Sequence, residues 1–330
     1  MMTTTSTYAP TPSPAATSTA KTQKRLRNWE AEDAAQIRRG HIDLYIAKAI
    51  FERPKRDGRR RRPQLYSDGL FFAALVLRKL ERRAYRPLEG YLQALCRLMG
   101  IDAPTPDHTT LWRRMEHISV PPLKLPKGKC TVILDSTGVK TFGPGEWAIW
   151  KHRESVKRRY LKLHAARDAA SGQILGWELT PPEGYGSGDV SQGTRLMKAL
   201  LERGLELEAV AADGAYDSAD LREFIHRAGA RVLIPPPRSA RLTSAKKGRH
   251  HEPEPWERER DEQILVDWRE GEGAWKKASG YHVRSLVETT FSRRQALFGG
   301  RLMSRLPVRQ LQEVAMEVWL MNEYTSRSLA

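Results

Sequence analysis

Three acidic residues stand where carboxylates could hold metal ions. Asp135 and Asp213 each follow a short apolar run, and Glu288 ends the segment 281–288, which also contains Tyr281 and Arg284. Carboxylate oxygens are the hard ligands that Mg²⁺ prefers. Three of them can hold two ions about 4 Å apart and stabilise both the attacking and the leaving oxygen of a phosphoryl transfer. The sequence therefore offers a two-metal site for phosphoryl transfer, provided that the three side chains converge.

Each of these residues also has a plainer explanation. Asp before Ser or Gly, as at Asp135 and Asp213, commonly forms a turn. Arg284 and Glu288 have the spacing of a surface ion pair on a helix. However, Tyr281 shares one helical face with both of them, so a helix could present a phenol, a guanidinium and an acid to one site. The catalytic interpretation depends on whether the two aspartates lie together.

The middle of the chain predicts the sheet that would place the aspartates. A buried strand is followed by a hairpin, and further strands then alternate with helices, which indicates a mixed α/β sheet with helices on both faces. If the fourth strand lies beside the first, both aspartates emerge at the same C-terminal edge, where such sheets bind ligands. The segment 235–262, with five prolines, is expected to be a loop before a final helical stretch. The expected strands are 131–134, 160–166, 174–179, 207–212 and 231–234, and the expected helices are 190–203 and 218–228.

The N-terminal part of the chain is expected to contain a helical region, preceded by a disordered tail and a basic arm. Residues 1–20 carry no charge, ten Ser or Thr and three Pro, which is typical of a disordered tail. Residues 21–62 form a basic arm that could lie along phosphates or serve as a solvated linker. Apolar spacing then predicts helices over 68–80, 88–99 and 109–118 within a region 63–120, as in a helix-turn-helix-like DNA-binding domain or any small helical bundle. The third helix, with Asp107 as its N-cap, would present Thr109, Arg113 and Arg114 to DNA.

The charge of the chain indicates a polyanionic partner. Lys and Arg total 56 against 39 Asp and Glu, giving a formal net charge of +17. Two cysteines are too few for a disulfide scaffold. No apolar run is long enough to span a membrane, so we expect a cytoplasmic protein. Between Trp150 and Tyr160 lies a cluster that is either a phosphate-contact surface or a solvated hairpin connection, with Lys151, Arg153, Lys157, Arg158 and Arg159 as its main members.

Several motifs together resemble the DDE transposases of bacterial insertion sequences. The three acids are 78 and 75 residues apart, and the last of them closes a Tyr-x2-Arg-x3-Glu signature. The similarity runs from about Tyr66 to Leu320. Finer features are similar to the insertion-sequence-five branch: Tyr66-Ser-Asp68, Pro106-Asp107-x-Thr109-Thr110-Leu111, Gly145-Glu146-Trp147, Lys162-Leu-His164 and Gly280-Tyr281-His282.

The resemblance implies a fold, an activity and a cofactor. It implies an RNase H-like catalytic domain over 128–325, with Asp135, Asp213 and Glu288 as ligands of two Mg²⁺ ions, for which Mn²⁺ would substitute. It implies cleavage of the element's ends, followed by attack of the freed 3′-hydroxyls on target DNA. The partners would be double-stranded DNA and, in the synaptic complex, a second copy of the chain. The enzyme would act in a bacterial cytoplasm, on the nucleoid when bound to DNA.

The resemblance also assigns DNA contacts and leaves two rival functions open. Tyr281 and Arg284 would hold a phosphate near the cleaved end, and Lys162 belongs to the same expected DNA surface. Where the family signature has a Lys, this chain has Gln295, so a neighbouring arginine such as Arg294 would supply the charge or the contact would be weaker. The rivals are a nuclease that cleaves without joining and a transposase-derived DNA-binding protein without activity.

Overall fold

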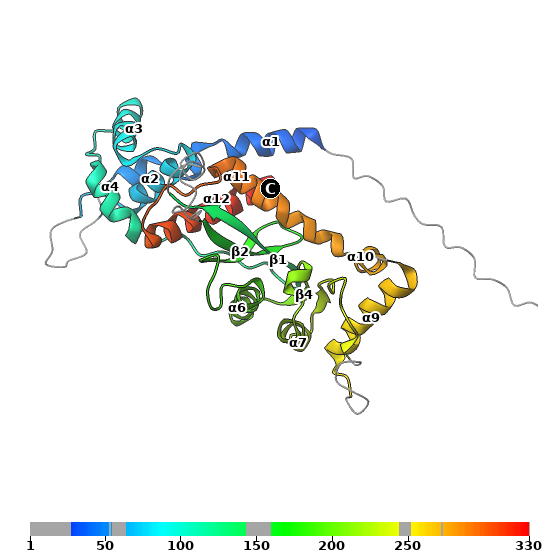
Figure 1. Cartoon of the computed structure of the whole chain (residues 1–330). Coiled ribbons are helices and arrows are strands. Elements are labelled where there is room, and N and C mark those ends of the chain that lie inside the picture. Colours follow the sequence, from blue (N-terminus) through cyan, green and yellow to red (C-terminus); the bar gives the residue numbers. More distant parts are fainter. Residues whose placement is uncertain are drawn as a thin grey trace, which may run out of the picture.

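A five-stranded mixed sheet forms the centre of the molecule (Figure 1), whose computed structural model describes residues 28–52, 54, 64–142, 160–243, 252–271 and 273–329. The strand order is β3-β2-β1-β4-β5. The first three strands form an antiparallel meander, and β4 and β5 continue the sheet in parallel with β1. This is the RNase H-like arrangement, so the expected fold class is confirmed. The strands are β1 (Cys130–Lys140), β2 (Tyr160–Asp168), β3 (Ile174–Thr180), β4 (Leu207–Ala211) and β5 (Arg231–Leu233).

Strand β1 lies at the centre of the sheet because its apolar residues are buried on both faces. Val132, Ile133 and Leu134 are each almost fully buried, as expected of a run with no polar face. The strand continues to Lys140, farther than the sequence predicted, because β2 pairs with it from Val132 to Lys140. Asp135 therefore lies inside the strand and not at its end, which corrects the sequence-based expectation.

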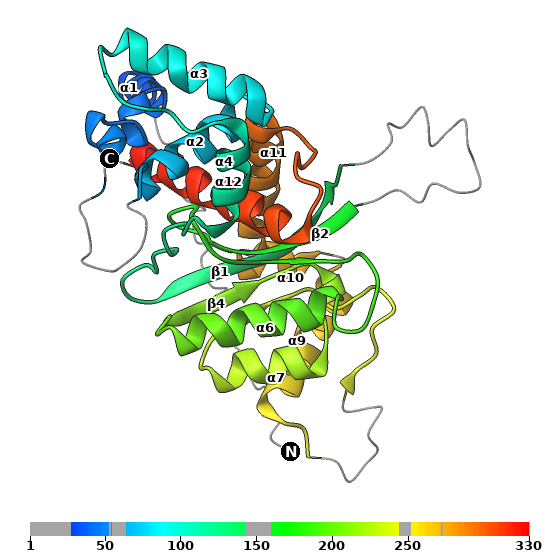
Figure 2. The same cartoon turned by 90° about the vertical axis from the view of Figure 1, so that its left-hand side faces the viewer.

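Helices cover both faces of this sheet (Figure 2). Val132 and Leu134 point to the face covered by α6 and α7, while Ile133 packs against the opposite face, near α11. On that side, α12 and the N-terminal helices complete the layer. The α-helices are α1 (Trp29–Arg39), α2 (Asp68–Leu80), α3 (Tyr85–Leu98), α4 (His108–Arg114), α6 (Asp189–Glu202), α7 (Ala219–Arg227), α9 (Pro255–Glu270), α10 (Ala274–Ser279), α11 (Leu286–Phe298) and α12 (Pro307–Leu329). Short 3-10 turns are η1 (Ile42–Leu44), η2 (Lys48–Phe51), η3 (Met115–His117), η4 (Gly214–Tyr216) and η5 (Tyr281–Ser285).

The three helices predicted before the sheet are present. The N-cap of α4 is Asp107, whose Oδ1 accepts a hydrogen bond from Thr110 N at 2.7 Å. These helices do not form a core of their own. Leu70 of α2 and Leu88 of α3 share one apolar cluster with Leu163 of β2 and Val314 of α12. The helical region is therefore packed onto the sheet.

One predicted loop is partly a helix. The segment 235–262 was expected to lack regular structure, but α9 begins at Pro255. Proline suits the first turn of a helix because its missing N–H has no partner there. Glu254 and Glu257 add a reciprocal capping box. The prolines thus mark the start of a helix, and the sequence interpretation was wrong at this point.

A buried network of four charges joins α2, α11 and α12. Lys79 Nζ contacts Glu313 Oε1 at 2.6 Å and also pairs with Glu317, whose other oxygen lies 2.5 Å from Arg294 Nη2. All four side chains are at most 5% exposed. Glu313 also accepts backbone hydrogen bonds from Met303 and Ser304. The two positive and two negative charges therefore balance each other in a place that water does not reach.

In the part of the chain that the structure describes, no helix is both long and apolar enough to cross a bilayer.

Replacing Lys79 with Met should strongly destabilise the fold. The change removes the cation that lies between two buried carboxylates, and breaking a buried pair in this way costs about 3–5 kcal/mol. Urea denaturation measures the free energy of unfolding. As a control, Glu223→Gln removes an exposed pair with Arg227 and should cost less than about 0.5 kcal/mol. Equal stability of Lys79→Met and wild type would contradict the network's role.

Candidate active site

The register of the sheet brings Asp135 and Asp213 together. In the parallel pairing of β1 and β4, Ile133 stands opposite Ala211. Each aspartate lies two residues beyond one of these partners, so its side chain leaves on the same face of the sheet. This places both carboxylates beside each other, as the sequence predicted.

Val287 positions the third acid above this pair. It is fully buried against Ile133 and Ala211 and so fixes the first turn of α11 on the sheet. Glu288 is the next residue. Arg284 lies in the preceding turn η5, so the segment 281–288 is a 3-10 turn that passes into an α-helix and not one continuous α-helix.

The guanidinium of Arg284 lies between the three carboxylates. Its Nη2 is 3.2 Å from Asp135 Oδ2 and 3.6 Å from Asp213 Oδ2, and its Nη1 pairs with Glu288 Oε1. The ion pair of Arg284 with Glu288, which was the plainer interpretation of their spacing, is thus present within the convergent cluster. Three negative charges face one positive charge.

Each aspartate uses one oxygen for the backbone and turns the other to the shared point. Asp135 Oδ1 accepts a hydrogen bond from Ser136 N at 2.8 Å, and Asp213 Oδ1 accepts one from Ala215 N at 3.0 Å. The Oδ2 atoms are those that face Arg284. The backbone therefore orients both carboxylates before any ligand arrives.

Burial and the neighbouring charges together shift the pKa values of the site's side chains. Burial raises the pKa of Asp135, and the nearby Asp213 and Glu288 raise it further, while the Ser136 N–H and Arg284 oppose the shift. Burial lowers the pKa of Arg284, but the carboxylates outweigh it and the pKa is raised. Burial also raises the pKa of the Tyr281 phenol. Asp135 is 12% exposed and Glu288 60%, so the cluster opens to solvent on the side of the helix.

The donors at this point suit a hard divalent cation, although a guanidinium lies there now. Among the residues with described placement, no three His, Cys, Asp or Glu side chains stand close enough to hold a metal ion as they are. Three carboxylates nonetheless converge on one cationic group, and their excess negative charge matches a divalent ion. The residues fit the metal once Arg284 yields its place.

A polar cluster behind Asp135 was not predicted from the sequence. Asp189, at the start of α6, pairs with Lys162 Nζ at 2.7 Å and with the buried His164 at 3.4 Å. Tyr216 is buried beside it, and its pKa is raised by burial and by Asp189. Ser136 forms side-chain hydrogen bonds with both Asp189 and Tyr216. Only the motif Lys162-Leu-His164 hinted at this cluster.

Two expected DNA contacts are engaged elsewhere. Lys162 is paired with Asp189, so its charge is balanced inside the protein. Arg294 is buried and paired with Glu317 in the network of α2, α11 and α12. It therefore does not supply a surface charge beside Gln295, because the helix turns residue 294 towards the core and residue 295 towards solvent.

The remaining expected contacts divide in three ways. Thr109 and Arg113 are exposed on α4. Arg114 is partly buried, forming an ion pair with Asp68 at 2.8 Å and lying over the ring of Phe71. The basic cluster Lys151, Arg153, Lys157, Arg158 and Arg159 lies outside the described residues.

Comparisons with known proteins give one family. Residues 126–322, more than half of the chain, match the family model described as Transposase DDE domain, and residues 37–144 match a second model of that description. A piggyBac transposase synaptic complex with hairpin DNA is similar with a TM-score of 0.40 and 10% identity, over 90% of this chain and 71% of that chain. A Drosophila P element transposase strand transfer complex is similar with a TM-score of 0.28 and 14% identity, over 55% of this chain and 42% of that chain. A Mos1 strand transfer complex is similar with a TM-score of 0.23 and 10% identity, over 76% of this chain and 83% of that chain.

Metal binding at this site should stabilise the fold and depend on Asp135. A ligand present at a hundredfold excess over its dissociation constant adds about 2.7 kcal/mol, so Mg²⁺ or Mn²⁺ should raise the wild-type melting temperature. Asp135→Asn removes one charged ligand and should abolish the rise. The matched change Asp220→Asn, on the exposed side of α7, should leave it intact. The same metal-induced shift in Asp135→Asn as in wild type would exclude Asp135 as a ligand.

Proposed function

The chain belongs to the Transposase DDE domain family, and we propose that it is the transposase of a bacterial insertion sequence of the insertion-sequence-five branch. As a member of the family it is an enzyme of DNA transposition that depends on a divalent metal. We propose that it binds the element's terminal inverted repeats, cleaves the DNA ends by hydrolysis and joins the 3′-hydroxyls to target DNA.

One observation carries this proposal. Asp135, Asp213 and Glu288 come from three separate parts of the chain and contact the same guanidinium. A turn-forming aspartate or a surface ion pair requires no such convergence. Carboxylates gathered around a single cationic point are the arrangement that metal-dependent phosphoryl transfer needs.

The three carboxylates would hold the metal ions, and the Oδ2 atoms of the aspartates, which now face Arg284, would be the oriented ligands. Bound divalent ions, two Mg²⁺ in our proposal or Mn²⁺ in their place, would polarise the scissile phosphate and activate the attacking oxygen. Buried Val287 keeps Glu288 over the sheet, so that the third ligand is added without a large rearrangement.

Arg284 and Tyr281 would bind the DNA beside the reacting phosphate. Once a metal takes its place among the carboxylates, the Arg284 guanidinium can turn its planar fork of donors to phosphate oxygens. The ring of the half-buried Tyr281 lies 5.9 Å from that of Trp275, and Lys276 Nζ lies 5.6 Å over it. Both residues precede Glu288 in one segment, so contact with DNA and ligation of metal are coupled.

The charge of the chain supports double-stranded DNA as the partner. The net charge of +17 favours association with phosphates. We propose that two copies act together, because two element ends must be joined in concert. The place of action would be the bacterial cytoplasm, on the nucleoid.

Replacing Glu288 with Gln should abolish activity while preserving DNA binding. The loss of a charged metal ligand should lower cleavage at least about a hundredfold, since metal ions contribute several kcal/mol to the transition state. The assay uses DNA that carries the element's own ends, with Mg²⁺ or Mn²⁺, and scores nicked and joined strands. Glu270→Gln makes the same chemical change at the exposed end of α9 and should keep full activity.

The same assay separates the rival functions. Joined product that is covalently linked to target DNA identifies a transposase, and cleavage without joining identifies a nuclease. Salt-sensitive binding of DNA by wild type with no cleavage under either metal would instead identify a DNA-binding protein derived from a transposase.

A further inference from the structure

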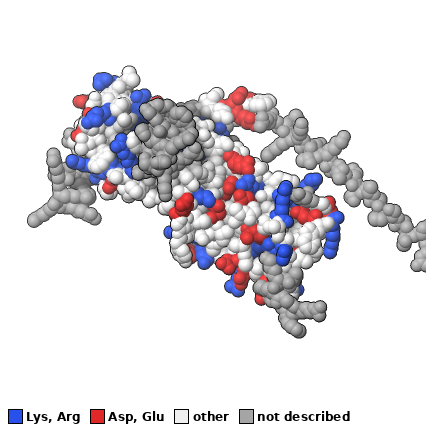
Figure 3. Space-filling model, viewed as in Figure 1, with Lys and Arg blue, Asp and Glu red and all other residues white. Residues whose placement is uncertain are grey.

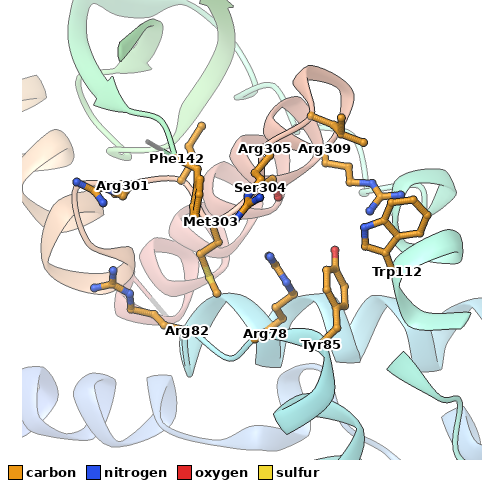
Figure 4. Close-up of a pocket in the computed structure, with 13 residues that line it drawn as sticks. Arg78, Arg82, Tyr85, Trp112, Phe142, Arg301, Met303, Ser304, Arg305 and Arg309 are labelled. Carbon is orange, nitrogen blue, oxygen red and sulfur yellow. The ribbon is translucent and has the colours of Figure 1, made fainter. Parts of the chain in front are cut away.

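A second site lies between the N-terminal helices and the segment that leads into α12. It is a cavity of about 660 Å³ lined by α2, α3, α4 and residues 301–309 (Figure 4). Its size lies within the usual range for sites that bind small groups. Phe142, just after β1, closes one side. The cavity is thus enclosed by α2, α3 and α4, by the end of β1 and by residues 301–309.

Arginines dominate this cavity, and no acid lines it among the residues that the structure describes. Five guanidinium groups enter the lining from three parts of the chain. Of these, Arg309 pairs with Glu116 at 2.8 Å, outside the cavity lining. Within the described ranges, no carboxylate pairs with Arg82, Arg301 or Arg305. The lining arginines are Arg78, Arg82, Arg301, Arg305 and Arg309.

Aromatic rings alternate with these charges. Arg305 lies 4.1 Å over the ring of Phe142, and Arg309 lies 3.6 Å over Trp112. Phe142 is 43% and Trp112 44% exposed, which leaves part of each ring open. Figure 4 shows Trp112 beside Tyr85 on one side of the hollow and Phe142 beside Arg305 on the other.

Two buried arginines have unused donors here. Arg78 is 5% and Arg309 7% exposed, yet Arg78 Nε and Arg309 Nη1 have no hydrogen-bond partner within the described structure. A buried charged donor without a partner is costly. Gly299 leaves space for the Arg82 guanidinium, because a Cβ at that position would lie 2.5 Å from Arg82 Nη1.

We propose that this pocket binds an unpaired nucleotide of a DNA strand, with the phosphates on Arg82, Arg301 and Arg305 and the base against the exposed aromatic rings. Basic side chains interleaved with aromatic rings suit single strands, since every base has a face that can stack. A simple anion would need the arginines alone, and a duplex would not bring its stacked bases to the rings. The open rings therefore favour the nucleotide.

The pocket lies close enough to the acid cluster for one DNA molecule to reach both. Phe142 follows Asp135 by seven residues, so their Cα atoms are at most about 25 Å apart. Basic side chains also gather over the end formed by α3 and α4 (Figure 3). This use of the pocket rests on the proposed function for its DNA, but binding can be measured without any cleavage.

Photocrosslinking of the full-length protein tests the proposal. The probe is a short thymidine oligonucleotide that carries 5-iodouracil, irradiated in EDTA so that no reaction occurs, and the crosslinked residues are identified by mass spectrometry. The proposal expects crosslinks at Trp112, Tyr85 or Phe142. Crosslinks that map only to other parts of the chain would overturn it.

Affinity measurements separate the charges from the rings. Replacing Arg301 and Arg305 with Gln should reduce the slope of log affinity against log salt by about 1.4, as expected for two lost phosphate contacts on a single strand. Arg195→Gln removes an arginine that is 69% exposed on α6 and should have no such effect beyond loss of net charge. An equal effect of the pocket variant and of Arg195→Gln would overturn the proposal. Because Arg305 is exposed, Arg305→Gln alone serves if the double variant melts early.

An abasic version of the oligonucleotide tests stacking. It should bind to wild type at least about fivefold more weakly than the intact strand, because stacking of one base is worth about 1–3 kcal/mol. In Phe142→Ala, the difference in affinity between the intact and the abasic strand should be smaller. Equal binding of the abasic strand would show a plain anion site and overturn the nucleotide assignment. Glu288→Gln should keep the crosslink. A wild-type protein that crosslinks at the pocket yet never cleaves would refute the proposed function while leaving the pocket in place.

Discussion

Four buried charges determine where both sites of this molecule lie. Lys79 of α2 pairs with Glu313 and Glu317 of α12, and Glu317 pairs in turn with Arg294 of α11. None of these charges can be left alone, because an unpaired ion in the interior costs several kcal/mol. The three helices must therefore stay in register. Glu313 also binds the backbone of Met303 and Ser304, so the segment beside the arginine pocket is tied to the same network.

Helix α11 carries this constraint to the acid cluster. Its C-terminal half is fixed by Arg294 and its first turn by Val287 on the sheet. Between these anchors, Glu288 can only lie above the two aspartates. Three carboxylates in one place repel each other, so the site requires a cation, and Arg284 supplies it from the preceding turn. The fold thus holds three acids at one point and balances them with the Arg284 guanidinium.

The sequence predicted the sheet and its aspartates well because apolar runs and spacing are local signals. The sequence left open whether the fourth strand lies beside the first, and the pairing of Ile133 with Ala211 in the structure is what brings the two aspartates together. The extension of β1 past Asp135 could not be predicted, since it comes from pairing with β2. The ion pairs of Arg294 with Glu317 and of Lys162 with Asp189 could not be predicted either. Each joins residues far apart in the sequence, so the local pattern around the basic residue does not indicate its partner.

The partners of the basic residues therefore decide which of them can meet DNA. Lys162, Arg294 and Arg309 each face a carboxylate of the protein, so a phosphate would have to compete with an ion pair that is already formed. Arg82, Arg301 and Arg305 have no carboxylate partner within the described residues, and a phosphate would meet no such competitor there. The net charge includes paired and unpaired basic residues equally. Composition could therefore indicate a polyanionic partner but not the place where it binds. Which basic residues are free to contact a phosphate depends on where the protein's own acids lie, and the described lining of the pocket beside α2 contains no acid.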